Sequence, residues 1–309
     1  MSAITPEALQ HELPEQYVSR FADHRIGFGK MLRSEWLKMW TLRSTWWMVG
    51  ATIVLMAGLS LLFAAVMNLV LNDPDIMAQM AENAATGEGI DMTQFAVGII
   101  IVVLGYQFAQ LTVAVFAVMT ITNEYSSGMI RATFSATPRR LRTLWAKLIM
   151  VTLTTAVISV IGLALAWLVS YPLLDRNNML VDFSDSTQIR SLIGAVLVLV
   201  MTAWFALGIG TVLRHTAGGI ATVLGLFMVV PSILGIIVMF APDLAWLSTI
   251  YKFLPSEAGQ QIVIPSIGMG MGGGATVPSL EPWHGFAVLS AYAVIALAAG
   301  ALVIKKRDA

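Results

Sequence analysis

Residues 123–140 read NEYSSGMIRATFSATPRR, a polar stretch that separates two long apolar runs. The uncharged run before it, residues 92–123, has 32 residues, and the run after it, residues 148–174, has 27. About 20 apolar residues in a helix cross the hydrocarbon core of a bilayer, so each run is long enough to span a membrane. The stretch therefore predicts a polar hinge between two membrane-spanning helices.

The composition of the whole chain points to the same class of protein. Of its 309 residues, 57% are hydrophobic and only 12% are charged, and the mean hydropathy is +0.78. A soluble domain carries about 25% charged residues, so this composition is typical of an integral membrane protein. The sequence contains no cysteine, which excludes a disulfide framework, a thiolate metal site and a cysteine nucleophile.

Six uncharged runs predict six transmembrane helices. We place them at about 45–71, 96–122, 146–171, 191–213, 217–241 and 283–304. A seventh uncharged run, residues 258–280, has a suitable length but is rich in glycine and proline. These residues destabilise a lipid-exposed helix. We interpret the run as a short re-entrant or interfacial element in a loop at 243–281.

The charges are distributed unevenly between the two sides of this six-span arrangement. One side, formed by residues 1–43, the loop 123–145 with the adjoining Lys147, the turn at Arg214 and residues 305–309, holds 15 of the 18 lysines and arginines. The opposite loops hold 11 of the 18 acidic residues. Because basic residues remain on the cytoplasmic side, we expect both termini and the hinge to be cytoplasmic. The first 30 residues contain acids and no apolar core, so we expect no cleavable signal peptide.

Residues 28–43 predict an amphipathic helix on the inner leaflet. Its apolar stripe is formed by Leu32, Trp36, Met39 and Trp40. Arg33 flanks this stripe, and Lys30 and Lys38 lie on the opposite side of the helix. The pattern fits a plain membrane anchor and a partner-binding helix equally well.

The predicted spans carry little reactive chemistry. No charged side chain falls inside the six uncharged runs, whereas proton relays and ion pathways usually retain one. This disfavours an ion-coupled transporter and an intramembrane enzyme. The amides Asn68, Gln107 and Gln110 are expected to join helices, or else to line a pathway. We find neither a metal-ligand spacing nor a nucleotide-binding motif, so we expect no metal or cofactor on this chain.

The hinge has a distinct conformational pattern. Glu124 is expected to end the second span, Gly128 can adopt a positive φ, and Pro138 restricts the residue before it to extended conformations. A helix of about two turns fits between the glycine and the proline. We expect the Glu124 carboxylate to accept backbone N–H bonds at its start, or to pair with an arginine across an interface. An ordinary polar loop whose arginines only set the topology is the simpler alternative.

The pattern Glu124-x3-Gly128-x-Ile130-x5-Ala136-Thr137-Pro138-Arg139 resembles the ABC-2 type permeases, the membrane subunits of many bacterial ABC exporters. Residues 34–38, SEWLK, and 42–47, LRSTWW, look like actinobacterial members of that family. The chain departs from the family at Met129 and Phe134, where members often carry threonine and leucine.

The resemblance implies a complete architecture. The fold would be an all-α integral membrane protein of six transmembrane helices, with an N-terminal amphipathic cytoplasmic helix and a short cytoplasmic coupling helix. The connecting helix before the first span would include Glu35, Trp36 and Lys38. Contacts with a separate ATPase subunit would come from the coupling segment, namely Glu124, Tyr125, Gly128, Ile130, Arg131, Thr137, Pro138 and Arg139.

The resemblance also implies the partners and the function. A second permease subunit and ATPase subunits would complete the exporter in the bacterial plasma membrane, with ATP and Mg²⁺ bound by the ATPase and no cofactor bound by this chain. The chain itself would not be an enzyme, and it would carry an amphipathic or hydrophobic compound outward. The alternative from another class is a membrane scaffold that regulates a soluble partner without transport.

Overall fold

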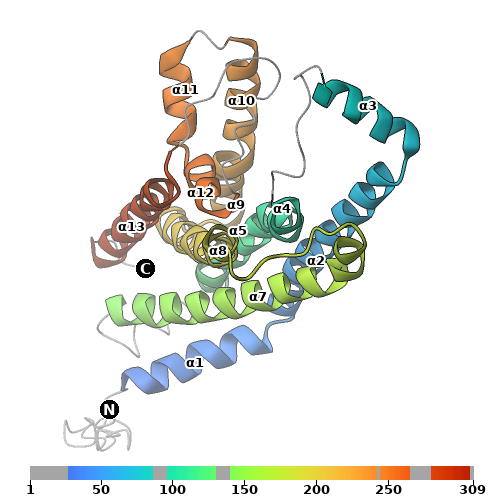
Figure 1. Cartoon of the computed structure of the whole chain (residues 1–309). Coiled ribbons are helices and arrows are strands. Elements are labelled where there is room, and N and C mark those ends of the chain that lie inside the picture. Colours follow the sequence, from blue (N-terminus) through green and yellow to red (C-terminus); the bar gives the residue numbers. More distant parts are fainter. Residues whose placement is uncertain (1–26, 86–95, 130–139, 242–243, 265–279, 307–309) are drawn as a thin grey trace, which may run out of the picture.

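The computed structural model describes residues 27–85, 96–129, 140–241, 244–264 and 280–306, and the regular structure of these residues is helical throughout (Figure 1). Within these described ranges, six helices are long and apolar enough to cross a membrane. They are Arg43–Leu71, Val97–Ser126, Leu141–Arg176, Ser186–Leu213, Thr216–Phe240 and Pro282–Lys306. The prediction of six spans is confirmed at this level, and the chain has the fold of a multi-pass helical membrane protein.

Four of the spans are single helices: α2 (Arg43–Leu71), α7 (Arg140–Arg176), α8 (Ser186–Leu213) and α13 (Pro282–Lys306). The second span is divided into α4 (Val97–Leu104) and α5 (Tyr106–Ser126). The fifth consists of α9 (Thr216–Leu224), a π-helical turn (Gly225–Val229) and α10 (Val230–Phe240). Shorter helices lie outside the spans: α1 (Phe28–Thr41), α3 (Pro74–Ala85), α11 (Ala245–Lys252) and α12 (Pro255–Val263).

Gly105 separates α4 from α5 at the point where α2 crosses the second span. A Cβ atom added to Gly105 would lie 2.6 Å from the Cα and the carbonyl oxygen of Met56 on α2. Real Cβ atoms do not approach backbone so closely, so a side chain at this position would push the two helices apart. The glycine thus explains both the break and the close crossing.

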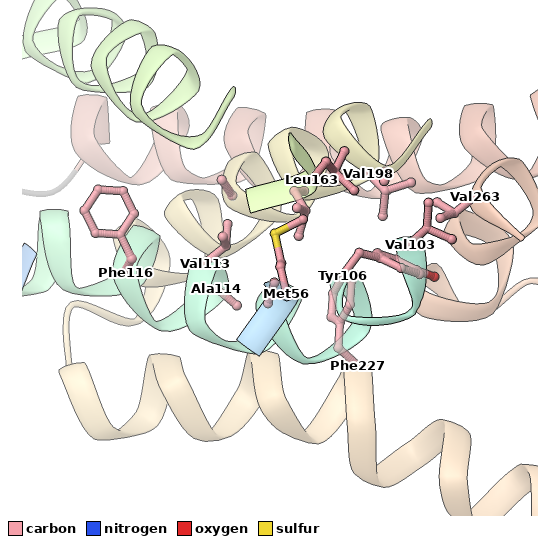
Figure 2. Packing of buried hydrophobic residues seen from close by; sticks show 14 of the residues in the cluster. Met56, Val103, Tyr106, Val113, Ala114, Phe116, Leu163, Val198, Phe227 and Val263 are labelled. Atoms are coloured by element: carbon pink, nitrogen blue, oxygen red, sulfur yellow. The ribbon is translucent and has the colours of Figure 1, made fainter. Parts of the chain in front are cut away.

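α8 lies at the centre of the molecule and packs against α5, α7, α12 and α13. The main apolar core surrounds it, and Figure 2 shows part of this core, with Met56 of α2 and Tyr106 of α5 near Leu163 and Val198. By contrast, few residues of two other spans are buried within the chain. In the most apolar 18-residue stretch, 17% of the residues are buried in α2 and 22% in the fifth span. These two spans therefore present most of their surface to lipid or to another protein.

The two ends of the bundle differ in charge. At one end the chain turns at Ser126, Arg140, Arg214 and Lys306, and we call this the basic end. A second, smaller apolar cluster closes it and joins four helices through Ile121, Leu144, Leu148, Leu207 and Ile304. At the opposite, acidic end, Asn177 at the end of α7 donates a hydrogen bond to Asn68 of α2 at 3.1 Å.

Several observed helices extend past the predicted spans, at both ends of the bundle: α7 ends at Arg176 rather than near residue 171, and α8 begins at Ser186 rather than near 191. α5 continues to Ser126 rather than stopping near residue 122, and α7 begins at Arg140 rather than near 146. The predicted spans therefore mark the apolar part of each helix, and the helices continue past them through charged residues, as expected for α5 at Glu124. The rejected run at 258–280 contains the end of the nine-residue α12, and residues 265–279 lie outside the described part.

Candidate functional site

α1 packs on the first half of α7 through one face (Figure 1). The residues buried on this face are Met31, Glu35 and Met39, which follow one another at intervals of four and so lie in one line along the helix. Glu35 is 3% exposed. An acid at the centre of a buried apolar face requires a cationic partner, since burial of an unpaired carboxylate is costly.

The partner of Glu35 is Lys147 of α7. The Lys147 ammonium donates to Glu35 Oε2 at 2.6 Å and to Glu124 Oε1 at 3.0 Å. Lys38, one turn after Glu35 on α1, donates to Glu35 Oε1 at 2.8 Å and to Glu124 Oε1 at 2.9 Å. Two acids and two lysines thus form a closed, neutral ring, which we call the ion network. It joins α1 to the last turn of α5 and to the first turns of α7.

Two members of the network, Glu35 and Lys38, lie on α1 outside the spans, and their pKa values are shifted. Burial raises the pKa of the Glu35 carboxyl, but the charge and hydrogen bond of Lys147, followed by those of Lys38, outweigh burial and leave this pKa below its usual value. For Lys38, burial acts to lower the pKa, but hydrogen bonds and charges from Glu35 and Glu124 leave it raised. Both shifts favour the charged forms, so the α1 part of the network is ionised at neutral pH.

The structure gives Glu124 two partners that the sequence did not predict. Its carboxylate was expected to bind backbone N–H groups of a following short helix, or an arginine across an interface. In the structure Glu124 lies within α5, is 6% exposed, and pairs with two lysines of its own chain. Its second oxygen, Oε2, is buried without a hydrogen-bond partner among the described residues, so the network retains capacity to accept one more donor.

The hinge begins directly after the network. Gly128 has a φ of 72°, as predicted, and a Cβ atom placed there would meet no described residue within 4 Å. The requirement for glycine is therefore set by the backbone, not by packing. The remaining predicted coupling residues, Ile130, Arg131, Thr137, Pro138 and Arg139, lie outside the described residues.

Tyr125 connects the hinge to two further helices. The guanidinium of Arg214, which ends α8 in a left-handed conformation, lies 5.1 Å from the centre of the Tyr125 ring. Arg214 also donates to the Val303 carbonyl of α13 at 3.4 Å. In addition, Thr216 of α9 donates to Thr122 of α5 at 3.0 Å. The end of α5 is thus attached to α1, α7, α8, α9 and α13.

A neighbouring face of α1, about 100° around the helix from the buried face, carries tryptophans. Trp36 and Trp40 are 44% and 37% exposed, with ring centroids 5.0 Å apart, and Trp46 at the start of α2 lies 4.8 Å from Trp40. The predicted stripe is therefore divided. The two tryptophans of α1 point away from the protein, whereas Met39 belongs to the buried face, because α7 rather than the membrane covers that side.

The three predicted amides have different environments. Gln110 is 3% exposed and donates to Thr202 of α8 at 2.8 Å. Asn68 joins α2 to the end of α7. Both therefore join helices. Gln107 is exposed on the outside of the chain, so the structure separates it from Gln110.

Lys147 was not identified as a site residue from the sequence, where it only marked the end of a polar segment. The periodicity of the sequence does indicate its burial if the helix is taken to begin at Arg140. Lys147 then falls in a stripe with i, i+3, i+4 and i+7 spacing, formed by Leu144, Lys147, Leu148 and Val151, and all four residues are buried. A lysine within a buried stripe predicts an acidic partner on a neighbouring helix.

The described residues contain no group of three or more histidine, aspartate or glutamate side chains that could hold a metal ion. Fold and site together define a multi-pass helical membrane protein with a buried ion network at its basic end. A model of the DUF2705 family, described as a protein of unknown function, matches residues 61–309. The chain belongs to this family, and the match includes Glu124 and Lys147 but begins after α1. A comparison with curated proteins found no match.

Proposed function

We propose that this chain is the membrane subunit of an ATP-driven exporter of the ABC-2 type, which moves an amphipathic or hydrophobic compound outward together with a separate ATPase. The six-span fold and the resemblance of the hinge support this proposal. The ion network is the observation that carries it furthest, because it lies where a soluble partner could act on several helices at once.

The network would make the basic end respond as one unit. The hinge leaves α5 after Ser126 and returns at Arg140, and the network joins both flanking helices to α1. Removing one partner of a buried ion pair costs about 3–5 kcal/mol. A push on the hinge would therefore move α1, α5 and α7 together before it separated them. A polar loop between independently mobile helices would absorb the same push locally.

In this mechanism ATP and Mg²⁺ are bound by the partner, and this chain contributes no catalytic group. Closure of two ATPase subunits would displace the hinges of two permease subunits, either two copies of this chain or this chain and a related one. The connected helices would then switch the cavity between the two permease subunits from inward-facing to outward-facing. The tryptophan face of α1 would remain in the inner leaflet as a pivot.

The test is reconstitution in liposomes. The purified chain alone should show only background ATP hydrolysis. Addition of an ATPase encoded beside it should give hydrolysis and ATP-dependent accumulation of a lipophilic dye on the side opposite the ATPase. A stable complex with that ATPase but no vectorial transport of any compound would favour the scaffold function instead. Saturable ATP binding by the chain alone would contradict the proposal.

A further inference from the structure

α1 and α2 are joined at Leu42, and we call this bend the elbow (Figure 1). Residues 28–47 on its two sides contain four basic side chains and one acid. The acid, Glu35, is buried and is shared between Lys38 and Lys147 in the ion network. Three other basic residues are exposed and form no ion pair within the described residues: Lys30, Arg33 and Arg43. The ion network thus hides the only acid of the elbow and leaves three unpaired positive charges on its surface.

Exposed tryptophans accompany these charges. Arg33, Trp36 and Trp40 are spaced i, i+3 and i+7 and so lie on one side of α1. Trp46 of α2 donates from Nε1 to the Trp40 carbonyl oxygen at 3.1 Å, and the two rings are 4.8 Å apart, so the aromatic row continues across the elbow. Trp47 beside it is exposed as well. Exposed indoles interleaved with basic side chains are typical of a surface at the headgroup depth of a bilayer.

A cleft lies beside the elbow, between α2 and α5. It is lined by Leu42, Ser44, Thr45 and Met48 on the elbow side and by Phe116, Met119, Thr120 and Asn123 of α5. From Asn123 at the basic end to Phe116, it extends roughly 10 Å along α5. Its polar side chains are concentrated near the basic end, whereas Met48 and Phe116 lie at its inner end. The cleft is therefore amphipathic in the direction expected for a lipid whose headgroup lies at the membrane surface.

Two polar side chains of the cleft are free to bind such a headgroup. The main-chain carbonyl oxygen of Asn123 accepts from the Ser127 hydroxyl at 2.7 Å, but its side-chain amide has no hydrogen-bond partner in the described part of the chain. The same holds for the Ser44 hydroxyl. Arg43, directly before Ser44, is exposed. An amide, a hydroxyl and a guanidinium are all donors that bind phosphate oxygens.

We propose that the elbow and the cleft bind an anionic phospholipid from the leaflet at the basic end. Its phosphate would lie at Arg43, Ser44 and Asn123, and an acyl chain would lie along Met48 and Phe116. The three unpaired positive charges select an anionic headgroup, because a zwitterionic one leaves them without a counter-charge. A lipid fits better than an acidic protein, because the cleft lies between two spans and α2 presents most of its surface outside the chain. The interaction does not depend on the proposed export function.

The proposal can be tested with two lipids that have the same acyl chains. Phosphatidylglycerol is anionic and phosphatidylcholine is zwitterionic. Native mass spectrometry of the full chain, released from detergent micelles after titration with each lipid, gives the affinity of the first bound lipid. The first phosphatidylglycerol should bind at least tenfold more tightly than the first phosphatidylcholine. Equal affinities would overturn the proposal. If the chain also bound poly-glutamate saturably in that case, the surface would be assigned to an acidic protein instead.

Variants of matched charge locate the site. Arg33→Gln combined with Arg43→Gln should weaken phosphatidylglycerol binding at least fivefold and leave phosphatidylcholine binding unchanged. The control, Lys305→Gln combined with Lys306→Gln, removes the same charge from another exposed segment of the basic end and should bind both lipids as the unmodified chain does. Thr120→Trp fills the cleft without a change of charge and should also weaken phosphatidylglycerol binding at least fivefold. An equal loss in the two charge variants, or no loss in Thr120→Trp, would overturn the site.

Discussion

Lys147 is the most deeply buried charge of the ion network, with 3% of its side chain exposed against 29% for Lys38. Lys147→Met would leave Glu35 and Glu124 facing one another with a single, partly solvated lysine. We expect a loss of about 3–5 kcal/mol and a Tm lower by roughly 5 °C or more. Lys38→Met should cost less, because water reaches its position. Thermal unfolding of both purified variants, followed by tryptophan fluorescence, tests this order, and an equal or reversed order would contradict it.

Glu124 connects stability to the proposed coupling. Glu124→Gln retains an acceptor for the two lysines but removes the negative charge. It also makes the position of Oε2, which has no hydrogen-bond partner among the described residues, a weaker acceptor for a donor from a partner protein. We expect substrate-stimulated ATP hydrolysis per assembled complex to fall by roughly tenfold, as expected when a buried charged contact is lost. Arg176→Ala, at the acidic end, is the control. Near-normal stimulation in Glu124→Gln would leave the network with a structural role only.

At the scale of elements, the docking of α1 on α7 should depend on pH. The pKa of Glu35 is lowered on folding, so its stabilising contribution is complete above its ordinary pKa of about 4.3 and is lost as the pH falls below that value. The pKa of Lys38 is raised, so its contribution is complete below its ordinary pKa of about 10.4 and is lost at still higher pH. Docking should therefore persist between about pH 5 and pH 10.

A single cysteine can report this docking, since the chain contains none. Met31 is 6% exposed on the buried face of α1. In Met31→Cys, 4,4′-dithiodipyridine should react slowly at pH 7 and much faster near pH 3. The same reagent should react rapidly at both values in Leu37→Cys, since Leu37 is 53% exposed. Protection of the Met31→Cys thiol that does not change down to pH 3 would show that apolar contacts alone hold α1.

The turn at Gly128 offers a test of the hinge that involves no charge. Because its φ is 72° and no atom of the described residues lies within 4 Å of an added Cβ, a substitution acts through the backbone alone. Valine resists a positive φ, whereas asparagine tolerates it. Gly128→Val should therefore reduce coupled ATP hydrolysis about tenfold or more, and Gly128→Asn should retain most of it. Equal activity of the two variants would mean that the direction of the chain at this residue is unimportant.

The elements that the sequence predicted best are those governed by local rules. Span length, the exclusion of charge and the positive φ of Gly128 depend on neighbouring residues only. The helices α5 and α7 extend past the predicted spans because Glu124 and Lys147 are tolerated inside helices through partners far away in the sequence. Lys147 is 112 residues from Glu35 and 23 from Glu124. Periodicity within one segment cannot reveal pairing over such distances.

The same limit explains the divided face of α1. Hydrophobicity grouped Met39 with Trp36 and Trp40, whereas the structure buries Met39 beside Glu35 and leaves the tryptophans exposed. The burial of an acid is favourable here only because α5 and α7 bring lysine and glutamate to the same place. For similar reasons Gln107 and Gln110 looked equivalent in sequence but differ in the fold, since only Gln110 faces α8.

At the scale of the whole molecule, the two ends place their acids in contrasting surroundings. The buried acids of the basic end are neutralised within the chain, which favours a rigid connection between helices. At the acidic end, Glu257 forms no ion pair within the described residues and lies in α12, which packs on the π-helical turn of the fifth span.

Coupling through the hinge requires that the basic end faces the cytoplasm, and we expect this orientation because the basic end carries most of the lysines and arginines. Ser127 is exposed at the basic end, and Glu281 is exposed at the acidic end. In intact cells, a membrane-impermeant maleimide should label Glu281→Cys at once and Ser127→Cys only after permeabilisation. The opposite labelling pattern would invert the topology, place the hinge out of reach of a cytoplasmic ATPase, and so exclude ATP-driven coupling through it.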